Sequence, residues 1–251
     1  MQVKNRRTKL MLLLFLIGEK THPYIVLDTG ILPIFNLTYN HKTKGTISGM
    51  LKGDLISRSA DHHAYRLTEK GYDELCLEFP FFRFVKHEWD GLWRVISYEI
   101  PEKKRDMRDR LRRSMKGWGL GPWHRSFWIT PHPIIENLRT LVYGREEEKY
   151  IHAFESTHIF GKREDLVEKV WSISEIEKKY RGALSQWHEL LSSEKKPKEK
   201  LTQITDLYID LIRDDPGLPK SLVTHRWIGF EAFFLFKEIK RILYQSTLLS
   251  V

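Results

Sequence analysis

Apolar residues near the start of the chain recur in three patterns of helical type. The uninterrupted apolar run Leu10 to Ile17 predicts a first helix that is deeply buried. A second apolar stretch, Ile31 to Tyr39, predicts another short helix, although Pro33 interrupts it. Between Thr43 and Lys52 the apolar residues return at helical spacing, and Gly53 supplies a C-terminal stop. These patterns predict three helices in succession.

A β-hairpin is predicted next, because two short runs typical of strands flank a polar turn. The strands are Ile56 to Arg58 and Ala64 to Leu67, and the turn between them is Ser59 to His63. The segment Thr68 to Gly71 then opens a fourth helix. Three helices, a hairpin and a further helix follow one another in the order of a winged helix.

The middle of the chain mixes strands with helices. Trp93 to Ile100 combines apolar and β-branched residues and predicts a buried strand, which Pro101 closes. A glycine-rich turn ends the helix that follows, and Ser126 to Thr130 predicts the next strand. One apolar stripe runs along that helix, formed by Met107, Leu111, Met115 and Trp118. Beyond it we expect a short helix, Ile134 to Tyr143, and two edge strands, Tyr150 to Phe154 and Thr157 to Phe160.

From Gly161 onward the pattern is helical throughout. Ser174 and Glu177 form a capping box that opens the second helix of this region. The residues that this helix is expected to bury are Ile176, Tyr180, Leu184, Trp187 and Leu191. A charged linker, Ser192 to Lys200, leads to a third helix, and the last helix begins near Trp227.

The chain carries an excess of positive charge, formally +9 at pH 7 over 251 residues. This excess favours an acidic partner, with nucleic acid first and a membrane surface second. The densest basic run occupies the polar faces of the helix that follows Pro101: Lys103, Lys104, Arg105, Arg108, Arg110, Arg112, Arg113 and Lys116. Only Glu102, Asp106 and Asp109 oppose it, so we expect this helix to face something acidic or a partner subunit.

The cysteine content bears on the compartment. Cys76 stands alone, which excludes an intramolecular disulfide and favours a reducing, cytoplasmic location. The Leu10 to Ile17 run follows basic residues as a signal peptide does, but no small-residue cleavage site comes after it. It is also far shorter than the roughly 18 apolar residues that a membrane span needs. No membrane partner is therefore expected.

Several short pieces of the chain occur in a characteristic order. In the middle they are Trp89-Asp90-Gly91, Trp93-Arg94, Ile100-Pro101-Glu102, Arg108 to Arg113, Gly119-Leu120-Gly121 and Trp128-Ile129-x-Pro131. Further pieces are Leu55-Ile56, Tyr65 to Gly71, Trp171-Ser172-Ile173, Tyr180-Arg181, Asp215 to Pro219 and Trp227 to Phe233. In this order they resemble the PaaX family of bacterial transcriptional repressors, over nearly the whole chain.

The resemblance implies a central ferredoxin-like domain similar to the small CRISPR adaptation nuclease called Cas-two. The expected fold class is α+β. A winged-helix domain spans residues 1–86, a ferredoxin-like dimerisation domain 87–162 and a helical C-terminal domain 163–251. The resemblance further implies a homodimeric repressor of a catabolic operon that binds double-stranded DNA. In that family a small acyl-coenzyme A effector releases the protein from its operator, and the C-terminal domain is a possible place for it.

In a winged helix the third helix enters the major groove, where its polar face meets base edges. Here that face offers His41, Lys42, Thr43, Lys44, Thr46, Ser48 and Lys52. The hairpin adds phosphate or minor-groove contacts from Arg58, His62, His63 and Arg66. Gly45 and Gly49 lie inside the expected recognition helix, and each costs about 1 kcal/mol relative to alanine. A protein-interaction adaptor that has lost DNA binding therefore stays open as an alternative.

Signatures of catalysis are scarce. The sequence holds no phosphate-binding glycine loop, no His-Glu-x-x-His and no paired Cys-x-x-Cys, so we expect neither an enzyme nor a cofactor or metal. Glu99 is the one weak candidate, since it closes the first strand where the Cas-two fold carries an aspartate thought to hold a metal. The longer side chain of glutamate moves the carboxylate, which octahedral magnesium tolerates poorly. A Cas-two-like nuclease or nucleic-acid scaffold is accordingly the runner-up.

Overall fold

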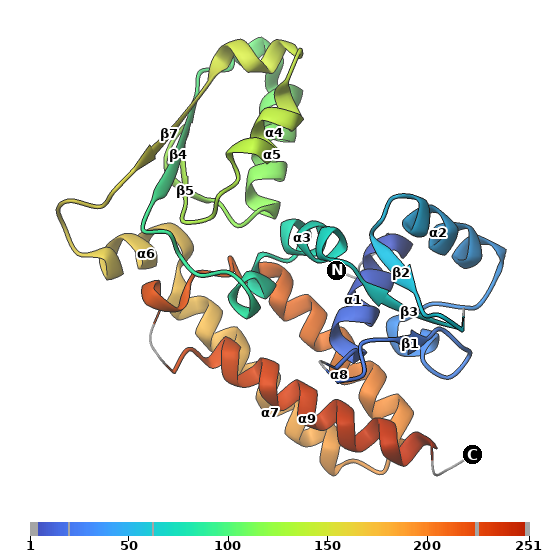
Figure 1. The fold of residues 1–251 in the computed structure, drawn as a ribbon. Helices are drawn as coiled ribbons and strands as arrows, with labels where there is room; N and C mark the ends of the chain where they lie inside the picture. The colour runs from blue at the N-terminus through green and yellow to red at the C-terminus, as the bar shows by residue number, and fades with distance from the viewer. Residues whose placement is uncertain (1–4, 20, 62, 224–225, 249–251) are drawn as a thin grey trace. The chain divides into compact units, whose positions relative to one another are not determined.

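The computed structural model describes residues 5–19, 21–61, 63–223 and 226–248 (Figure 1). The fold mixes helices with two antiparallel sheets, as the expected α+β class requires. Its contacts group the chain into two compact units. The first combines residues 1–75 with 177–212 and 228–251, and the second combines 76–176 with 213–227. This grouping differs from the three successive domains expected from the sequence, because the C-terminal helices are shared between the two units.

The first unit begins with the elements expected of a winged helix. They are α1 (Arg6–Ile17), β1 (Ile25–Val26), the 3-10 helix η1 (Leu32–Phe35), α2 (His41–Lys52), β2 (Ile56–Arg58), β3 (Ala64–Leu67) and α3 (Glu69–Glu78). The three strands pair in the order β1-β3-β2, and the hairpin has the predicted bounds. The second predicted helix is reduced to the single turn η1, because Pro33 stands at its start and Asn36 ends it in the left-handed region with a φ of 51°.

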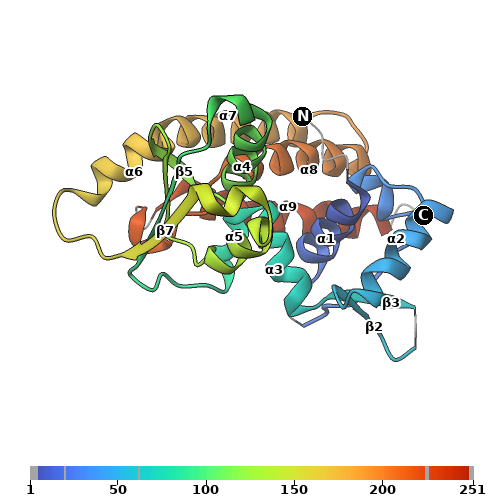
Figure 2. The same cartoon turned by 90° about the horizontal axis from the view of Figure 1, so that it is seen from above.

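The long helices of the same unit are α7 (Ile173–Ser192), α8 (Pro197–Asp214) and α9 (Ile228–Leu248). They lie side by side in both ribbon views (Figures 1 and 2). At their centre the Tyr208 ring stacks on Phe236 with 4.5 Å between centroids, and Trp187 meets Tyr208 edge-on. Leu191 was wrongly expected in this core, since its side chain is 38% exposed.

Helix α1 is covered by these C-terminal helices. Its side chains from Leu10 to Leu14 are buried, and the Phe15 ring lies 6.4 Å from that of Phe233 on α9. The buried Lys240 Nζ donates to the Ile17 carbonyl at 3.2 Å and pairs with Glu19 at 3.1 Å, which satisfies the C-terminal end of α1. A helix that is apolar on all sides needs such a cover, and α9 supplies it.

The second unit contains a βαββαβ arrangement. Its elements are η2 (Pro80–Val85), β4 (Trp93–Tyr98), η3 (Glu102–Lys104), α4 (Arg105–Gly117), β5 (Gly121–His124), β6 (Phe127–Thr130), α5 (Ile135–Val142), η4 (Glu146–Tyr150), β7 (Ile151–Ser156), α6 (Arg163–Trp171) and η5 (Lys220–Leu222). The strands form one antiparallel sheet in the order β5-β6-β4-β7, which is the ferredoxin-like order. The expected second edge strand, residues 157–160, is wrong, since β7 ends at Ser156 and no strand follows it in this described segment.

Each face of this sheet is covered by different elements. Helices α4 and α5 cover one face, where Ile96, Leu111 and Leu138 belong to a common core (Figure 1). Residues of the opposite face, Trp93 and Ile129, pack with α6 and η5. Alternate residues of β4 therefore serve two cores, as the two-residue repeat of a strand dictates.

The junction between α6 and α7 differs from the predicted capping box. Ser172 adopts a left-handed φ of 52°, and α7 begins directly after it, so Ser174 lies inside the helix. The Ser174 hydroxyl donates to the Glu168 carboxylate at 3.0 Å. Within the ranges that the structure describes, no helix is both long and apolar enough to cross a membrane.

Candidate nucleic-acid interface

Helix α2 is fixed in place by its N-terminal cap and its buried face. The Asn40 side chain accepts a hydrogen bond from the Thr43 backbone N–H at 3.0 Å, the usual N-cap arrangement. The Thr43 hydroxyl in turn donates to the Thr38 carbonyl at 2.7 Å. Thr43 is buried together with Ile47 and Met50, so it anchors the helix and does not belong to the exposed polar face.

The remaining residues predicted on α2 are placed differently from Thr43. The exposed side chains are those of His41, Lys42, Lys44, Ser48 and Lys52. Thr46 is half-buried, and its hydroxyl donates to the Lys42 carbonyl at 2.9 Å.

Two glycines stand at the centre of the exposed face of α2. Gly45 and Gly49 are exposed, and a Cβ built on either would meet no atom within 4 Å. Packing therefore does not demand glycine at these positions, and the exposed side of the helix presents bare backbone between its lysines.

The β2–β3 hairpin presents further cations. Arg58, His63 and Arg66 are exposed, and Arg66 Nε donates to the Ser57 hydroxyl at 3.0 Å. At the turn, Asp61 accepts a hydrogen bond from the Ser59 hydroxyl. That bond, more than the nearby His63 backbone N–H, holds the pKa of Asp61 below its ordinary value. The predicted contact from His62 lies outside the described residues.

Tyrosine rings support three of these cations, a feature that the sequence patterns did not reveal. The pairs are Lys44 over Tyr39 at 4.8 Å, Arg58 over Tyr65 at 5.4 Å and Arg66 over Tyr24 at 5.2 Å from the ring centroid. In the described part of this unit, no carboxylate forms an ion pair with the exposed lysines of α2 or the arginines of the hairpin. A cation held by an aromatic ring keeps its charge available, so this surface is positive and uncompensated.

The basic face of α4 and the preceding η3 differs from this surface in how its charges are compensated. Carboxylates of the same unit form ion pairs with four of its eight basic residues. The pairs are Lys104 with Glu146, Arg105 with Asp109, Arg108 with Glu102 and Arg110 with Glu147. Arg112 Nε donates to the Tyr98 hydroxyl at 2.6 Å. Of the described basic residues on this face, Lys103, Arg113 and Lys116 remain outside these pairs.

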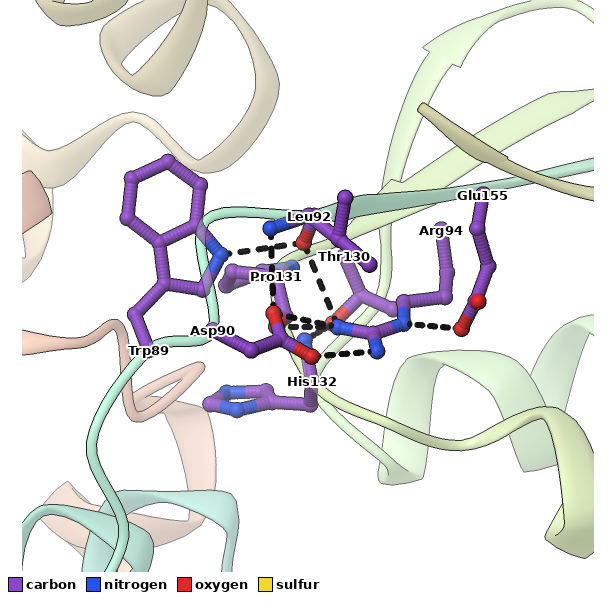
Figure 3. Close-up of polar contacts among 8 residues, drawn as sticks. All are labelled: Trp89, Asp90, Leu92, Arg94, Thr130, Pro131, His132 and Glu155. Atoms are coloured by element: carbon purple, nitrogen blue, oxygen red, sulfur yellow. Dashed lines mark hydrogen bonds and ion pairs between the residues drawn. The ribbon is translucent and has the colours of Figure 1, made fainter. Parts of the chain in front are cut away.

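A buried arginine organises the start of the central sheet (Figure 3). Arg94 donates to both carboxylate oxygens of Asp90, at 2.9 and 2.5 Å, and through Nε to Glu155 at 2.8 Å. The Leu92 and Pro131 carbonyls accept further bonds from it at 3.3 and 3.2 Å. These five acceptors satisfy a guanidinium that is only 4% exposed. The Trp-Asp-Gly…Trp-Arg pattern is therefore structural.

His132 lies beside this cluster and is also buried (Figure 3). Its ring Nε2–H donates to the Pro216 carbonyl at 3.2 Å. Burial, reinforced by the positive charge of Arg83, holds the pKa of His132 well below its ordinary value. The neutral imidazole thus joins the end of β6 to residues 213–227 of the same unit.

Glu99 does not sit in a metal-binding arrangement. It lies one residue beyond the end of β4, its side chain is exposed, and its backbone N–H donates to the Tyr150 carbonyl at 2.9 Å. Across the described ranges, no group of three or more His, Cys, Asp or Glu residues could hold a metal ion.

Comparison with known proteins finds two matching family models and a similar fold. The model of the PaaX protein central Cas2-like domain matches residues 86–167, and that of the PaaX-like protein C-terminal domain matches residues 171–248. No curated protein matches the sequence. An uncharacterized protein, Rv0674 from Mycobacterium tuberculosis, is similar in structure, with a TM-score of 0.54 and 16% identity over 97% of this chain and 98% of that chain.

These matches have different weights. At 16% identity the solved structure shows a shared fold and nothing about activity. The two family models follow one another along the sequence and together span well over half of it. The chain belongs to the PaaX family of transcriptional regulators.

Proposed function

We propose that this protein is a DNA-binding transcriptional regulator that acts as a dimeric repressor. The observation that carries the proposal is the uncompensated positive surface of α2 and the β2–β3 hairpin, which the tyrosine rings support. Nucleic acid is the natural partner of such a surface, because phosphate neutralisation and counterion release drive binding.

In the proposed complex α2 enters the major groove of double-stranded DNA. Lys42, Ser48 and Lys52 reach base edges or flanking phosphates, while Gly45 and Gly49 let the helix backbone approach closely. Arg58 and Arg66 position the hairpin on the phosphate backbone. Thr43 takes no part, since it is buried.

The dimer is proposed to form through the β7 edge of the central sheet. Strand β7 pairs on one side with β4 and is an edge strand, with Phe154 56% exposed. In the loop that follows its end at Ser156, Ile159 and Phe160 are 90% and 95% exposed. Large apolar side chains at an unpaired sheet edge favour a second copy as the covering surface. A symmetric dimer suits an operator with two half-sites.

The effector part of the proposal comes from family membership. An acyl-coenzyme A molecule would release the repressor only if it binds the DNA-incompetent state more tightly. A titration of acyl-coenzyme A thioesters into the protein–DNA complex tests this part separately from DNA binding.

The experiment for the main proposal is a salt series of binding to the DNA upstream of the protein's own gene. The triple variant Lys42→Gln, Lys44→Gln and Lys52→Gln should flatten the plot of log affinity against log salt by about 0.9 for each lost phosphate contact. A matched control removes the same charge from η3 and α4, with Lys103→Gln, Arg113→Gln and Lys116→Gln, and should keep the wild-type slope.

Three outcomes would overturn the proposal. Equal affinity for random DNA would exclude sequence-selective repression. The absence of DNA binding at low salt would favour the alternative function, a protein-interaction adaptor that has lost DNA binding. Magnesium-dependent cleavage that Glu99→Ala abolishes would instead identify a Cas-two-like nuclease.

A further inference from the structure

A cavity of about 470 Å³ lies beside α2 in the first unit. Helices α1, α2 and α3 and the residue before β2 form its walls. None of its charged residues was among the binding residues predicted from the sequence. The lining residues are Arg7, Thr46, Gly49, Met50, Gly53, Leu55, Lys70 and Glu74.

The charges of this cavity are unequal. Arg7 and Lys70 bring two positive charges, and Glu74 brings one negative charge. The Arg7 and Glu74 side chains form an ion pair although they are 41% and 38% exposed, so water and solutes reach both. Surface pairs of this kind are weak and exchange readily with other anions.

Arg7 also has an unused donor. Its Nε is buried, with no hydrogen-bond acceptor among the described residues, while its other end meets Glu74. A buried donor without an acceptor is costly, so the guanidinium gains by turning toward an anion in the cavity. An arginine fork binds phosphate through two parallel N–H bonds, which a single carboxylate contact does not provide.

The wall on the side of α2 is suited to a close approach. Gly49 is exposed on the helix, and a Cβ there would meet no atom within 4 Å. The same glycine belongs to the exposed face of α2 that the proposed function places in the major groove, so the cavity opens next to the DNA-binding face. A phosphate at this place lies on the strand that flanks the groove.

We infer that this cavity seats one backbone phosphate of the bound DNA, with Arg7 and Lys70 as its ligands and Glu74 as the carboxylate that holds Arg7 when DNA is absent. The inference rests on the proposed function and adds a contact from α1 and α3 to those of α2 and the hairpin. Glu74 then lowers affinity for DNA, because phosphate must displace it from Arg7.

The test compares salt slopes for DNA binding in single variants of the full chain. Arg7→Gln and Lys70→Gln should each flatten the slope by about 0.9 relative to wild type. Glu74→Gln should raise DNA affinity by about two- to fivefold at low salt, the effect of removing a weak surface pair. Combined with Arg7→Gln, it should give no gain.

The matched control is a second arginine–glutamate pair of the same unit. Arg181 pairs with Glu177 on α7 at 2.5 Å with exposures of 68% and 40%. Arg181→Gln and Glu177→Gln should leave both the slope and the affinity at wild-type values, since that pair lies outside the cavity.

The outcomes separate this inference from the proposed function. Wild-type slopes in Arg7→Gln and Lys70→Gln, with DNA still bound, would overturn the phosphate seat alone. Failure of the wild-type protein to bind DNA at low salt would overturn both. Inorganic phosphate tests whether the cavity binds free phosphate instead. It would then raise the melting temperature of wild type but not of Arg7→Gln. If the two proteins also have the same salt slope for DNA binding, the inference is wrong.

Discussion

Arg94 and Asp90 form a two-pronged ion pair in which both carboxylate oxygens accept from one buried guanidinium, at 2.9 and 2.5 Å. The Asp90 side chain is 44% exposed, whereas that of Arg94 is 4% exposed. The pair ties the loop before β4 to the strand itself. It serves the stability of the second unit and leaves no free charge for a ligand.

Asp90→Asn should destabilise the protein by about 1–3 kcal/mol, because it leaves the buried Arg94 with Glu155 as its sole charged partner. The partial exposure of Asp90 keeps the loss below that of a fully buried pair. Chemical denaturation at neutral pH measures it. Asp109→Asn breaks an exposed pair on α4 at 3.7 Å and should cost under about 0.5 kcal/mol. Equal losses of stability in the two variants would contradict the conclusion that the Asp90–Arg94 pair stabilises the second unit.

The same pair predicts a response to acid. The hydrogen bonds from Arg94 hold the pKa of Asp90 below its ordinary value. A carboxyl whose pKa is lower when folded stabilises the protein above its unfolded pKa, near 3.9, and loses this contribution as the pH falls through the folded value. The difference in unfolding free energy between wild type and Asp90→Asn should therefore shrink below about pH 4.

Gly45→Ala should stabilise the protein by roughly 1 kcal/mol, since the added methyl group meets open space and alanine is the better helix former. Thermal unfolding measures the gain. The contrasting variant is Gly71→Ala, whose Cβ would lie 2.0 Å from the Leu55 carbonyl oxygen and should destabilise. Stabilisation by both changes would show that helix propensity alone determines the effect on stability and that the clash at residue 71 does not matter.

His132 predicts a second dependence on pH. Its pKa is depressed in the folded state. On acidification this imidazole therefore becomes protonated in the unfolded chain while it stays neutral in the folded chain. Stability is complete above about pH 6.5 and falls below it by up to roughly 1.4 kcal/mol per pH unit. His132→Gln keeps a donor for the Pro216 carbonyl but does not titrate, so it should flatten this decline between pH 7 and 5.

The control for the histidine is His188→Gln, which removes an exposed histidine of α7 without touching Pro216. Its decline of stability with acid should match that of wild type. If His132→Gln loses as much stability as wild type between pH 7 and 5, a group other than His132 causes the response to acid.

Replacement of both Ile159 and Phe160 by glutamate should convert the proposed dimer into a monomer, because charge at a buried apolar contact is strongly unfavourable. Sedimentation equilibrium measures the mass. Tyr143→Glu changes another aromatic side chain of the same unit, 75% exposed, and should leave the mass unchanged. A wild-type monomer at micromolar concentration would reject the dimer directly.

Elements with a strong local pattern were predictable from the sequence. The α2 helix, the β2–β3 hairpin and α4 depend on periodicity and turn residues, which are local properties. Strand β5 was missed because Gly121 and Pro122 read as a turn. Proline is tolerated there since β5 is an edge strand, and glycine is required because a Cβ at 121 would lie 2.1 Å from Val170.

Features that depend on distant residues could not be predicted. The basic face of α4 and η3 looked unpaired because Glu146 and Glu147, which neutralise two of its cations, lie about forty positions later in η4. One residue of the candidate interface was mispredicted for the same reason. Thr43 looked available for contact with DNA, but its hydroxyl donates a hydrogen bond to the Thr38 carbonyl. The tyrosine rings beneath Lys44, Arg58 and Arg66 became apparent only once the strands were paired.

The contact between Lys240 and Glu19 joins residues 221 positions apart, and it has a consequence for biosynthesis. At the usual speed of translation, on the order of ten to forty seconds pass between the two residues leaving the ribosome. During that interval α1 has been made, but the helix that covers it has not. Its leucine-rich surface must be shielded by transient contacts or a chaperone, so the yield of folded protein depends on how fast the last helix arrives.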